Sequence, residues 1–207
     1  MTTSTHYIST YCHITPQQVS VDGVVLHSNT SETFENFLKQ LYKEHNCRYP
    51  KFFKMDTMSK LAFMGAEFLL KSAKEATTEV QNTALVFSNK SSSLETDRKH
   101  QESIASETEF YPSPAVFVYT LPNIGIGEVA IRHQLQTENA FFVFESFEAN
   151  FLQKYTVSLL REGKCNSALC GWVEVDKTEN HGFFYLVEAT GKWQHTEKNI
   201  TTFYNKI

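Results

Sequence analysis

The groups that could carry covalent chemistry in this chain are its four cysteines and a few serines. Cys12, Cys47, Cys165 and Cys170 form no CxxC pair and show no regular spacing. This irregular distribution of cysteines is typical of reduced, buried thiols rather than of a disulfide framework. Near Cys165 and Cys170 no pair of histidines has helical or hairpin ligand spacing, so we expect no metal site.

Ser146 is the serine with the most suggestive position. No serine lies in the G-x-S-x-G elbow of an α/β-hydrolase. Ser146, however, lies between a predicted strand at 140–144 and a predicted helix, where a helix amino terminus stabilises developing negative charge. The same position also suits a serine that caps the helix. On position alone, the capping role is favoured over the nucleophilic one.

The segment at 125–130, GIGEVA, matches the G-x-G-x-x-G/A pattern of dinucleotide-binding folds. Pro122 and Asn123 separate the preceding apolar run from these glycines. Glu128 would also place a negative charge where a pyrophosphate should bind. We therefore interpret the small residues as allowing a helix to pack closely, and we expect no cofactor.

The hydrophobic periodicity predicts strands that alternate with helices. Strands are expected at 6–11, 82–88, 140–144, 168–175 and 182–189, with a candidate strand at 115–119. Helices are expected from 34 to about 46, from 56 or 57 onward, around 126–133 and at 151–161. This order, with a terminal pair of strands, implies a layered α/β fold, and the length fits a single domain over residues 1–207.

One apolar run is unusually aromatic. Ala140, Phe141, Phe142, Val143 and Phe144 follow one another without a polar residue. This pattern predicts a strand that is buried on both faces or lies at an interface. Alternation places Phe142 and Phe144 on one face and Phe141 and Val143 on the other.

Composition excludes some classes of partner. The net charge is −4 and the basic residues form no dense block, so we expect no nucleic-acid binding. We expect no membrane span, because no run approaches about 18 apolar residues, and we expect a cytoplasmic protein, because no signal peptide is recognisable. The polar segment at 89–109 is predicted to form a solvated loop and helix that faces a partner.

Several segments, in order, resemble the amino-terminal half of β-ketoacyl synthases, which belong to the thiolase-like superfamily. The most specific is PSPAVFVYTLPNIGIGEVAIRHQLQTEN, which is close to that family's S-P-x-x-F-x-x-x-L-P-N-x-x-x-G-x-x-A-I-R. The others are HYISTYCHITP, KFFKMDTMSKLAFMGAEFLL, NTALVFSNKSSSLETDRKHQ and LLREGKCNSALCGWVEV. The resemblance implies a layered thiolase-like half-fold, a mixed β-sheet covered by helices, that corresponds to the ketosynthase amino-terminal half.

The departures from this family bear on catalysis. Ser146, 17 residues before Gly163, occupies the position at which the resemblance places the family's nucleophilic cysteine. A serine hydroxyl is a much weaker acid than a thiol and needs an adjacent base. The family's two catalytic histidines and its lysine lie in its carboxyl-terminal half, which is not expected within these residues, and His181 and His195 match none of those motifs. The resemblance therefore implies no catalytic residue, with Ser146 at a degenerate nucleophile position.

The resemblance also implies partners. In this family the strand before the nucleophile pairs with its twin across a two-fold axis, so Ala140, Phe141, Phe142, Val143 and Phe144 are expected at a dimer interface. The leading hypothesis is a non-catalytic subunit, similar to a chain length factor, that pairs with itself or with a true ketosynthase. Its pathway would be fatty-acid, polyketide or aryl-polyene synthesis, and it would shape an acyl tunnel or dock an acyl carrier protein. The alternatives are a split 3-oxoacyl-[acyl-carrier-protein] synthase completed by a separate chain, and a stand-alone acyl-binding module.

Overall fold

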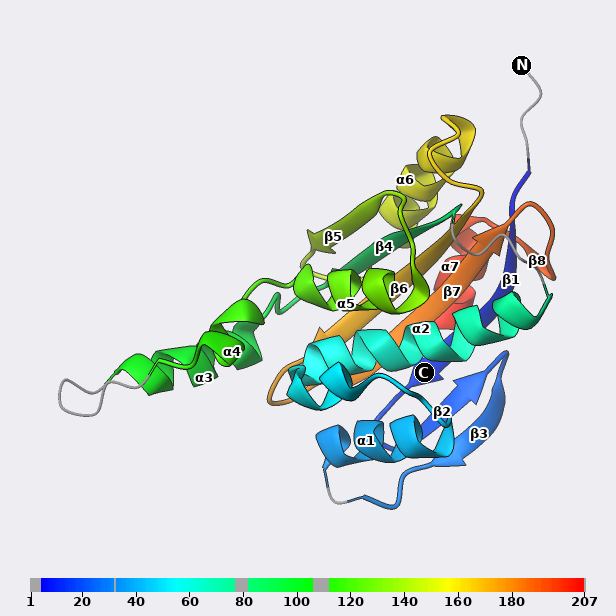
Figure 1. The fold of residues 1–207 in the computed structure, drawn as a ribbon. Helices are drawn as coiled ribbons and strands as arrows, with labels where there is room; N and C mark the ends of the chain where they lie inside the picture. The colour runs from blue at the N-terminus through cyan, green and yellow to red at the C-terminus, as the bar shows by residue number, and fades with distance from the viewer. Residues whose placement is uncertain (1–4, 32, 77–81, 106–111, 207) are drawn as a thin grey trace.

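The computed structural model describes residues 5–31, 33–76, 82–105 and 112–206, and it shows one mixed sheet between two layers of helices (Figure 1). Helices α1 (Phe34–Glu44), α2 (Thr57–Ala76) and α5 (Ile124–His133) pack on one face. Helices α6 (Ala149–Arg161) and α7 (Glu197–Tyr204) pack on the other. The predicted layered α/β architecture is confirmed.

The sheet has eight strands in the order β3-β2-β1-β7-β6-β4-β5, with β8 paired to β1. Their bounds are β1 Tyr7–Ile14, β2 Gln18–Val21, β3 Val24–Ser28, β4 Thr83–Asn89, β5 Asn139–Val143, β6 Ser167–Val175, β7 Asn180–Glu188 and β8 Trp193–Gln194. β4 runs parallel to β5 and to β6, and the remaining pairs are antiparallel. Strands β3 and β5 therefore form the two edges of the sheet.

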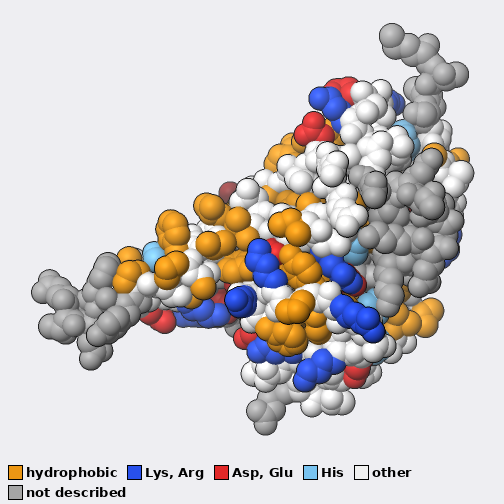
Figure 2. Space-filling model, in the orientation of Figure 1, with side chains coloured by type: hydrophobic (Ala, Val, Ile, Leu, Met, Phe, Trp, Pro, Cys, Tyr) orange, Lys and Arg blue, Asp and Glu red, His pale blue; other side chains and the backbone are white. Residues whose placement is uncertain are grey.

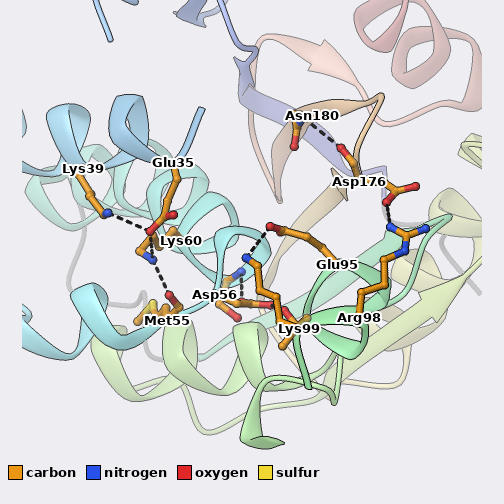
Figure 3. Close-up of polar contacts among 12 residues, drawn as sticks. Glu35, Lys39, Met55, Asp56, Lys60, Glu95, Arg98, Lys99, Asp176 and Asn180 are labelled. Atoms are coloured by element: carbon orange, nitrogen blue, oxygen red, sulfur yellow. Dashed lines mark hydrogen bonds and ion pairs between the residues drawn. The ribbon is translucent and has the colours of Figure 1, made fainter. Parts of the chain in front are cut away.

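Helix α2 is the most deeply buried helix of the first layer, and its two buried charges have partners. Lys60 is 3% exposed, and its ammonium group lies 2.9 Å from Oε1 of Glu35 on α1 (Figure 3). Glu67 is 2% exposed and accepts a 2.6 Å hydrogen bond from Nε of Arg132 on α5. Buried charges require such partners, so these pairs fix how α1, α2 and α5 pack.

The glycine-rich segment of α5 behaves as the sequence predicts. A Cβ at Gly125 would lie 3.2 Å from Oγ and 3.3 Å from Cα of Ser59 on α2. Gly125 therefore allows α5 to approach α2 closely. Glu128 is 3% exposed and binds Lys51 and the hydroxyls of Tyr49 and Tyr119. This carboxylate is occupied by the protein itself.

One expectation about the elements is wrong, and several elements were not predicted. Residues 115–119 do not form a strand, because Ser113 caps a short helix, α4 (Pro114–Val118), with Pro114 in its first turn. The helix expected within the polar segment at 89–109 is present as α3 (Leu94–Ile104), in the described residues of that segment. The strands β2, β3 and β8, the 3₁₀ helix η1 (Pro50–Lys54) and helix α7 were not predicted.

Candidate functional site

Four strands of the sheet end at the same edge. β7 is antiparallel to both β1 and β6, so β1 runs in the direction of β4, β5 and β6. Their carboxyl ends, Ile14, Asn89, Val143 and Val175, therefore lie along one edge, the carboxyl edge. Ligands of α/β sheets bind at this edge, and Ser146 follows β5 there.

Ser146 is exposed, and its hydroxyl has no hydrogen-bond partner among the residues that the structure describes. Helix α6 begins at Ala149, and its N-cap residue is Glu148, whose side chain makes no capping bond. The expectation that Ser146 caps this helix is therefore wrong, because the N-cap position lies two residues further along the chain, at Glu148. The hydroxyl is left free at the carboxyl edge.

A cleft of about 550 Å³ lies beside Ser146. It is lined by Lys90, Val143, Phe144 and Glu145. The amide of Phe144 donates a 2.9 Å hydrogen bond to the carbonyl of Asn89, which continues the contact of the two strands past the end of β5. One cation and one anion thus face a partly apolar opening next to the serine.

His181 lies on the other side of this edge, and the sequence did not identify it as part of the site. Its Nε2 is 3.4 Å from the hydroxyl of Tyr204, and its Nδ1 is 3.4 Å from Oε1 of Glu179. The Tyr204 ring stacks on Phe147 with centroids 4.0 Å apart. Burial lowers the pKa of His181 and raises that of Tyr204 to about 12. The contacts of this imidazole are with Tyr204 and Glu179, and none is with Ser146.

The register of the β6–β7 hairpin determines which residue faces His181. Glu174 on β6 is directly opposite His181 on β7, so both side chains lie on one face. Glu174 is 1% exposed and accepts hydrogen bonds of 2.7 and 3.3 Å from the amides of Lys90 and Ser91. The sequence predicted the two strands but not their register, and without the register it could not place Glu174 opposite His181.

Helix α3 is attached to the carboxyl edge by polar contacts. Arg98 on α3 forms an ion pair with Asp176 in the β6–β7 turn, and Asn180 donates to the carbonyl of Asp176 (Figure 3). Thr96 donates a 2.7 Å hydrogen bond to Asp56, just before α2. The polar segment is therefore anchored at one end, while α3 and α4 project away from the body of the protein (Figure 1).

The aromatic run at 140–144 lies at the edge of the sheet. Phe142 and Phe144 pack toward α6, and Phe141 packs toward the layer that contains α5. Val143 is 52% exposed, and no residue of the run is fully buried. The alternative that this strand is buried on both faces in the sheet interior is therefore wrong. The assignment of Ala140, Phe141, Phe142, Val143 and Phe144 to an interface remains a prediction.

Two further surface features, away from β5, could contact a partner. Phe117 and Val118 of α4 and the following Leu121 are 58%, 45% and 55% exposed and form an apolar arm. On the face shown in Figure 2, Lys and Arg side chains gather over α1 and η1 around an apolar patch. The exposed residues there that form this basic patch are Lys43, Arg48, Lys51, Phe53 and Lys54.

The cysteines do not contribute to the site. None of the four forms a disulfide, and all four are buried. Burial raises the pKa of Cys170 to about 12, which keeps this thiol protonated. Within the described residues, no group of three or more His, Cys, Asp and Glu side chains could hold a metal ion.

Comparison with solved structures identifies the fold. The ishigamide ketosynthase/chain length factor aligns with a TM-score of 0.63 at 17% identity, over 89% of this chain and 62% of that one. A structure of the ketosynthase ApeO in complex with its chain length factor ApeC from Xenorhabdus doucetiae aligns with a TM-score of 0.60 at 14% identity. The chain has a thiolase-like fold of the ketosynthase kind. The family expected from the sequence motifs is thus supported at the level of fold.

The extent of these matches differs. In the ApeO–ApeC structure, 98% of this chain aligns with 91% of the other, so the two chains are similar in length. A complex of the type II polyketide ketosynthase AntDE with its acyl-carrier protein AntF matches at a TM-score of 0.59 and 11% identity, and this chain spans 62% of that one. No family model and no curated protein sequence matches.

No helix in the described part of the chain is long and apolar enough to span a membrane.

Proposed function

We propose that this chain is a non-catalytic ketosynthase-like subunit that pairs with itself or with a true ketosynthase in polyketide, aryl-polyene or fatty-acid synthesis. The observation that carries the proposal is an exposed serine after β5, at the position where the ketosynthase motif has its cysteine. The structural similarity also supports the proposal, because two of the similar solved structures contain chain length factors.

The environment of Ser146 argues against acyl transfer by this chain. A serine becomes nucleophilic when an adjacent base removes its proton, at a distance of about 2.6–3.2 Å. Among the described residues none accepts a hydrogen bond from Ser146, and His181 contacts Tyr204 and Glu179 instead. Glu145 and Glu148 are exposed beside it and oppose the negative charge that develops on an attacked thioester.

The surface of β5 supports pairing with a second chain. As an edge strand, β5 hydrogen-bonds only β4 among the described strands and leaves its other side for a partner strand. The aromatic side chains of Phe142, Phe144, Phe151 and Tyr155 pack together there without being fully buried. This edge therefore presents apolar groups that a partner would cover.

The basic patch supports the docking of an acidic carrier protein. It contains the exposed basic residues Lys43, Arg48, Lys51 and Lys54 and the exposed ring of Phe53. Complementary charge steers the encounter with an acidic partner, and an exposed aromatic ring supplies apolar contact area. We infer that this patch receives an acyl carrier protein.

Intact-mass spectrometry tests the absence of acyl transfer. The protein is incubated with octanoyl-loaded and malonyl-loaded acyl carrier protein, with a cysteine-containing ketosynthase as positive control. We expect no added mass on the wild-type chain and no decarboxylation of the malonyl group.

The second candidate, a split synthase that uses Ser146, is favoured by the exposure of this hydroxyl at the carboxyl edge. It predicts an acyl adduct that disappears in Ser146→Ala. Such an adduct would overturn the non-catalytic proposal. If the chain is a stand-alone acyl-binding module, it also forms no adduct. In that case a pull-down from the native host would recover neither a ketosynthase nor a carrier protein with it.

A further inference from the structure

Three aromatic side chains surround the residue that follows Ser146 in the chain. The Phe147 ring stacks on that of Tyr204, with centroids 4.0 Å and planes 15° apart. It meets the rings of Trp172 and Phe183 edge-on, with centroids at 5.8 and 5.7 Å. These three partners, Trp172, Phe183 and Tyr204, form what we call the aromatic cage. The cage holds a benzyl group, and the chain itself supplies that group.

The walls of the cage are held in place independently of Phe147. Trp172 on β6 lies directly opposite Phe183 on β7, so both rings lie on one face of the sheet. They are 3% and 0% exposed. The hydroxyl of Tyr204 lies 3.4 Å from Nε2 of His181, also on β7. Because paired strands and a polar contact fix these walls, loss of the Phe147 side chain should leave an open site rather than a collapsed core.

The cage can be reached from solvent. Phe147 and Tyr204 are half-buried, and the preceding Ser146 is exposed. No cage residue carries a formal charge, and burial raises the pKa of Tyr204 to about 12, so its phenol stays neutral at pH 7. One stacking wall and two edge-on walls are the arrangements that aromatic rings prefer. The cage therefore matches a planar, neutral ring of the size of a phenyl group.

We propose that Phe147 is a specificity-determining residue: its ring closes the site next to Ser146, and once that ring is removed the aromatic cage takes the planar ring of an aryl-acyl group. The inference rests on the proposed function, because it adds a steric reason for the absence of acyl transfer. The two can fail separately. Loss of pairing through β5 would overturn the proposed function without affecting the cage, and a cage that binds no ring would overturn this inference without affecting pairing.

Titration of ¹⁵N-labelled Phe147→Ala with toluene, followed by NMR, tests the proposal. Toluene has the size and shape of the deleted side chain, and a cavity of about 150 Å³ lined by apolar side chains binds benzene. We expect saturable shifts of the indole N–H signal of Trp172. The chain has two tryptophans, so Trp193→Phe assigns that signal. Methylcyclohexane, which is apolar but not aromatic, should bind at least about threefold more weakly.

Two proteins serve as controls for this titration. In the wild type Phe147 fills the cage, so toluene should leave the indole signal of Trp172 unchanged. Phe117→Ala also removes a phenylalanine ring, but on α4, where the residue is 58% exposed. Toluene should leave the Trp172 signal of this variant unchanged as well.

An amide analogue of phenylacetyl-pantetheine extends the test to acyl groups. The amide does not acylate a hydroxyl, so its binding is measured separately from acyl transfer. By calorimetry it should bind Phe147→Ala at least tenfold more tightly than the wild type. The corresponding hexanoyl amide, which has no ring, should gain less from the same change.

The proposal would be overturned if toluene produced no saturable shift at Trp172 in Phe147→Ala. It would also be overturned if the wild type bound toluene at the cage as tightly as the variant, or if both bound the phenylacetyl analogue equally. If Phe147→Ala does not fold alone, it is refolded in buffer saturated with toluene. Failure to recover the native Trp172 signal there would count equally against the proposal.

Discussion

The ring of Phe184 lies directly over Gly65. A Cβ atom at Gly65, in α2, would come within 2.3 Å of Cε2 of Phe184, in β7. The same ring covers Gly171 and Gly182, where a Cβ would lie 2.9 and 2.6 Å from it. Three glycines from one helix and two strands thus create the space for one fully buried phenylalanine at the centre of the fold.

Gly65→Ala should therefore destabilise the protein, although alanine is the better helix former. Overpacking of a rigid core costs about 1–3 kcal/mol or more. The matched control is Gly127→Ala in α5, where a Cβ meets nothing within 4 Å. That change should be neutral or stabilising by up to about 1 kcal/mol. Urea unfolding of both variants measures the difference, and equal stabilities would show that Phe184 moves aside at little cost.

Acid should destabilise the fold through its buried histidines. Burial lowers the pKa of His195 to about 4, and nearby His6 acts in the same direction. Both ring nitrogens of His195 lack a partner in the described residues. In the unfolded chain the pKa is about 6.5, so the unfolded state takes up the proton first as the pH falls. The stability contributed by the neutral ring is complete above pH 6.5 and is lost toward pH 4.

Urea unfolding at pH 7 and pH 4.5 checks this direction. The free energy of unfolding should fall by at most about 1.4 kcal/mol per unit of pKa difference for each such ring. His195→Phe should reduce the loss because it removes one titrating group. A variant that loses as much stability on acidification as wild type would rule out His195 as a source of the effect.

Ser146→Cys should not create a condensing enzyme. The thiol is a better nucleophile, but the described residues place no base beside position 146, and positioned acid–base groups contribute about 10²–10⁴-fold each. Mass spectrometry of reactions with acyl-loaded and malonyl-loaded carrier protein checks this. Condensed product from the single variant, with no other chain added, would mean that the catalytic groups are present and wrongly located here.

Carrier-protein binding should depend on the basic patch and on ionic strength. Lys54→Glu should weaken the affinity for a phosphopantetheine-bearing acyl carrier protein by at least about threefold at low salt, because the change replaces attraction by repulsion. Lys54 is chosen because Lys51 is already paired with Glu128. Lys198→Glu, at an exposed position on α7, is the matched control. Calorimetry that finds no difference between the two variants would exclude this patch.

The sequence predicted the elements whose side-chain pattern matches one buried face. The helix that begins at Phe34 is an example, since Phe37, Leu38 and Leu41 recur at helical spacing and are fully buried. Strand β3 was not predicted. Its residues Val24 and Leu26 are exposed, so its hydrophobic pattern does not reflect burial in the core. α4 was mistaken for a strand because apolar content was weighed above the Ser113-Pro114 start signal.

The candidate site could be predicted only where one motif contained it. Ser146 was found because it follows the aromatic strand directly in the sequence. Glu174, His181 and Tyr204 come from three different elements, and the antiparallel register of β6 and β7 brings the first two together at one edge of the sheet. Such a register depends on the packing of the whole sheet, which no local pattern contains.

Sedimentation velocity on the wild type and two charge variants tests the pairing proposal most directly. Val143→Asp places a charge on β5, and Val24→Asp places one on β3 at the opposite edge, where the side chain is 63% exposed. The wild type and Val24→Asp should sediment as dimers, or as complexes with a ketosynthase recovered from the native host. Val143→Asp should be a folded monomer, since an unpaired charge in a desolvated contact costs about 3–5 kcal/mol. A wild-type chain that stays monomeric alone and with that ketosynthase, or a Val143→Asp variant that associates as the wild type does, would contradict pairing through β5.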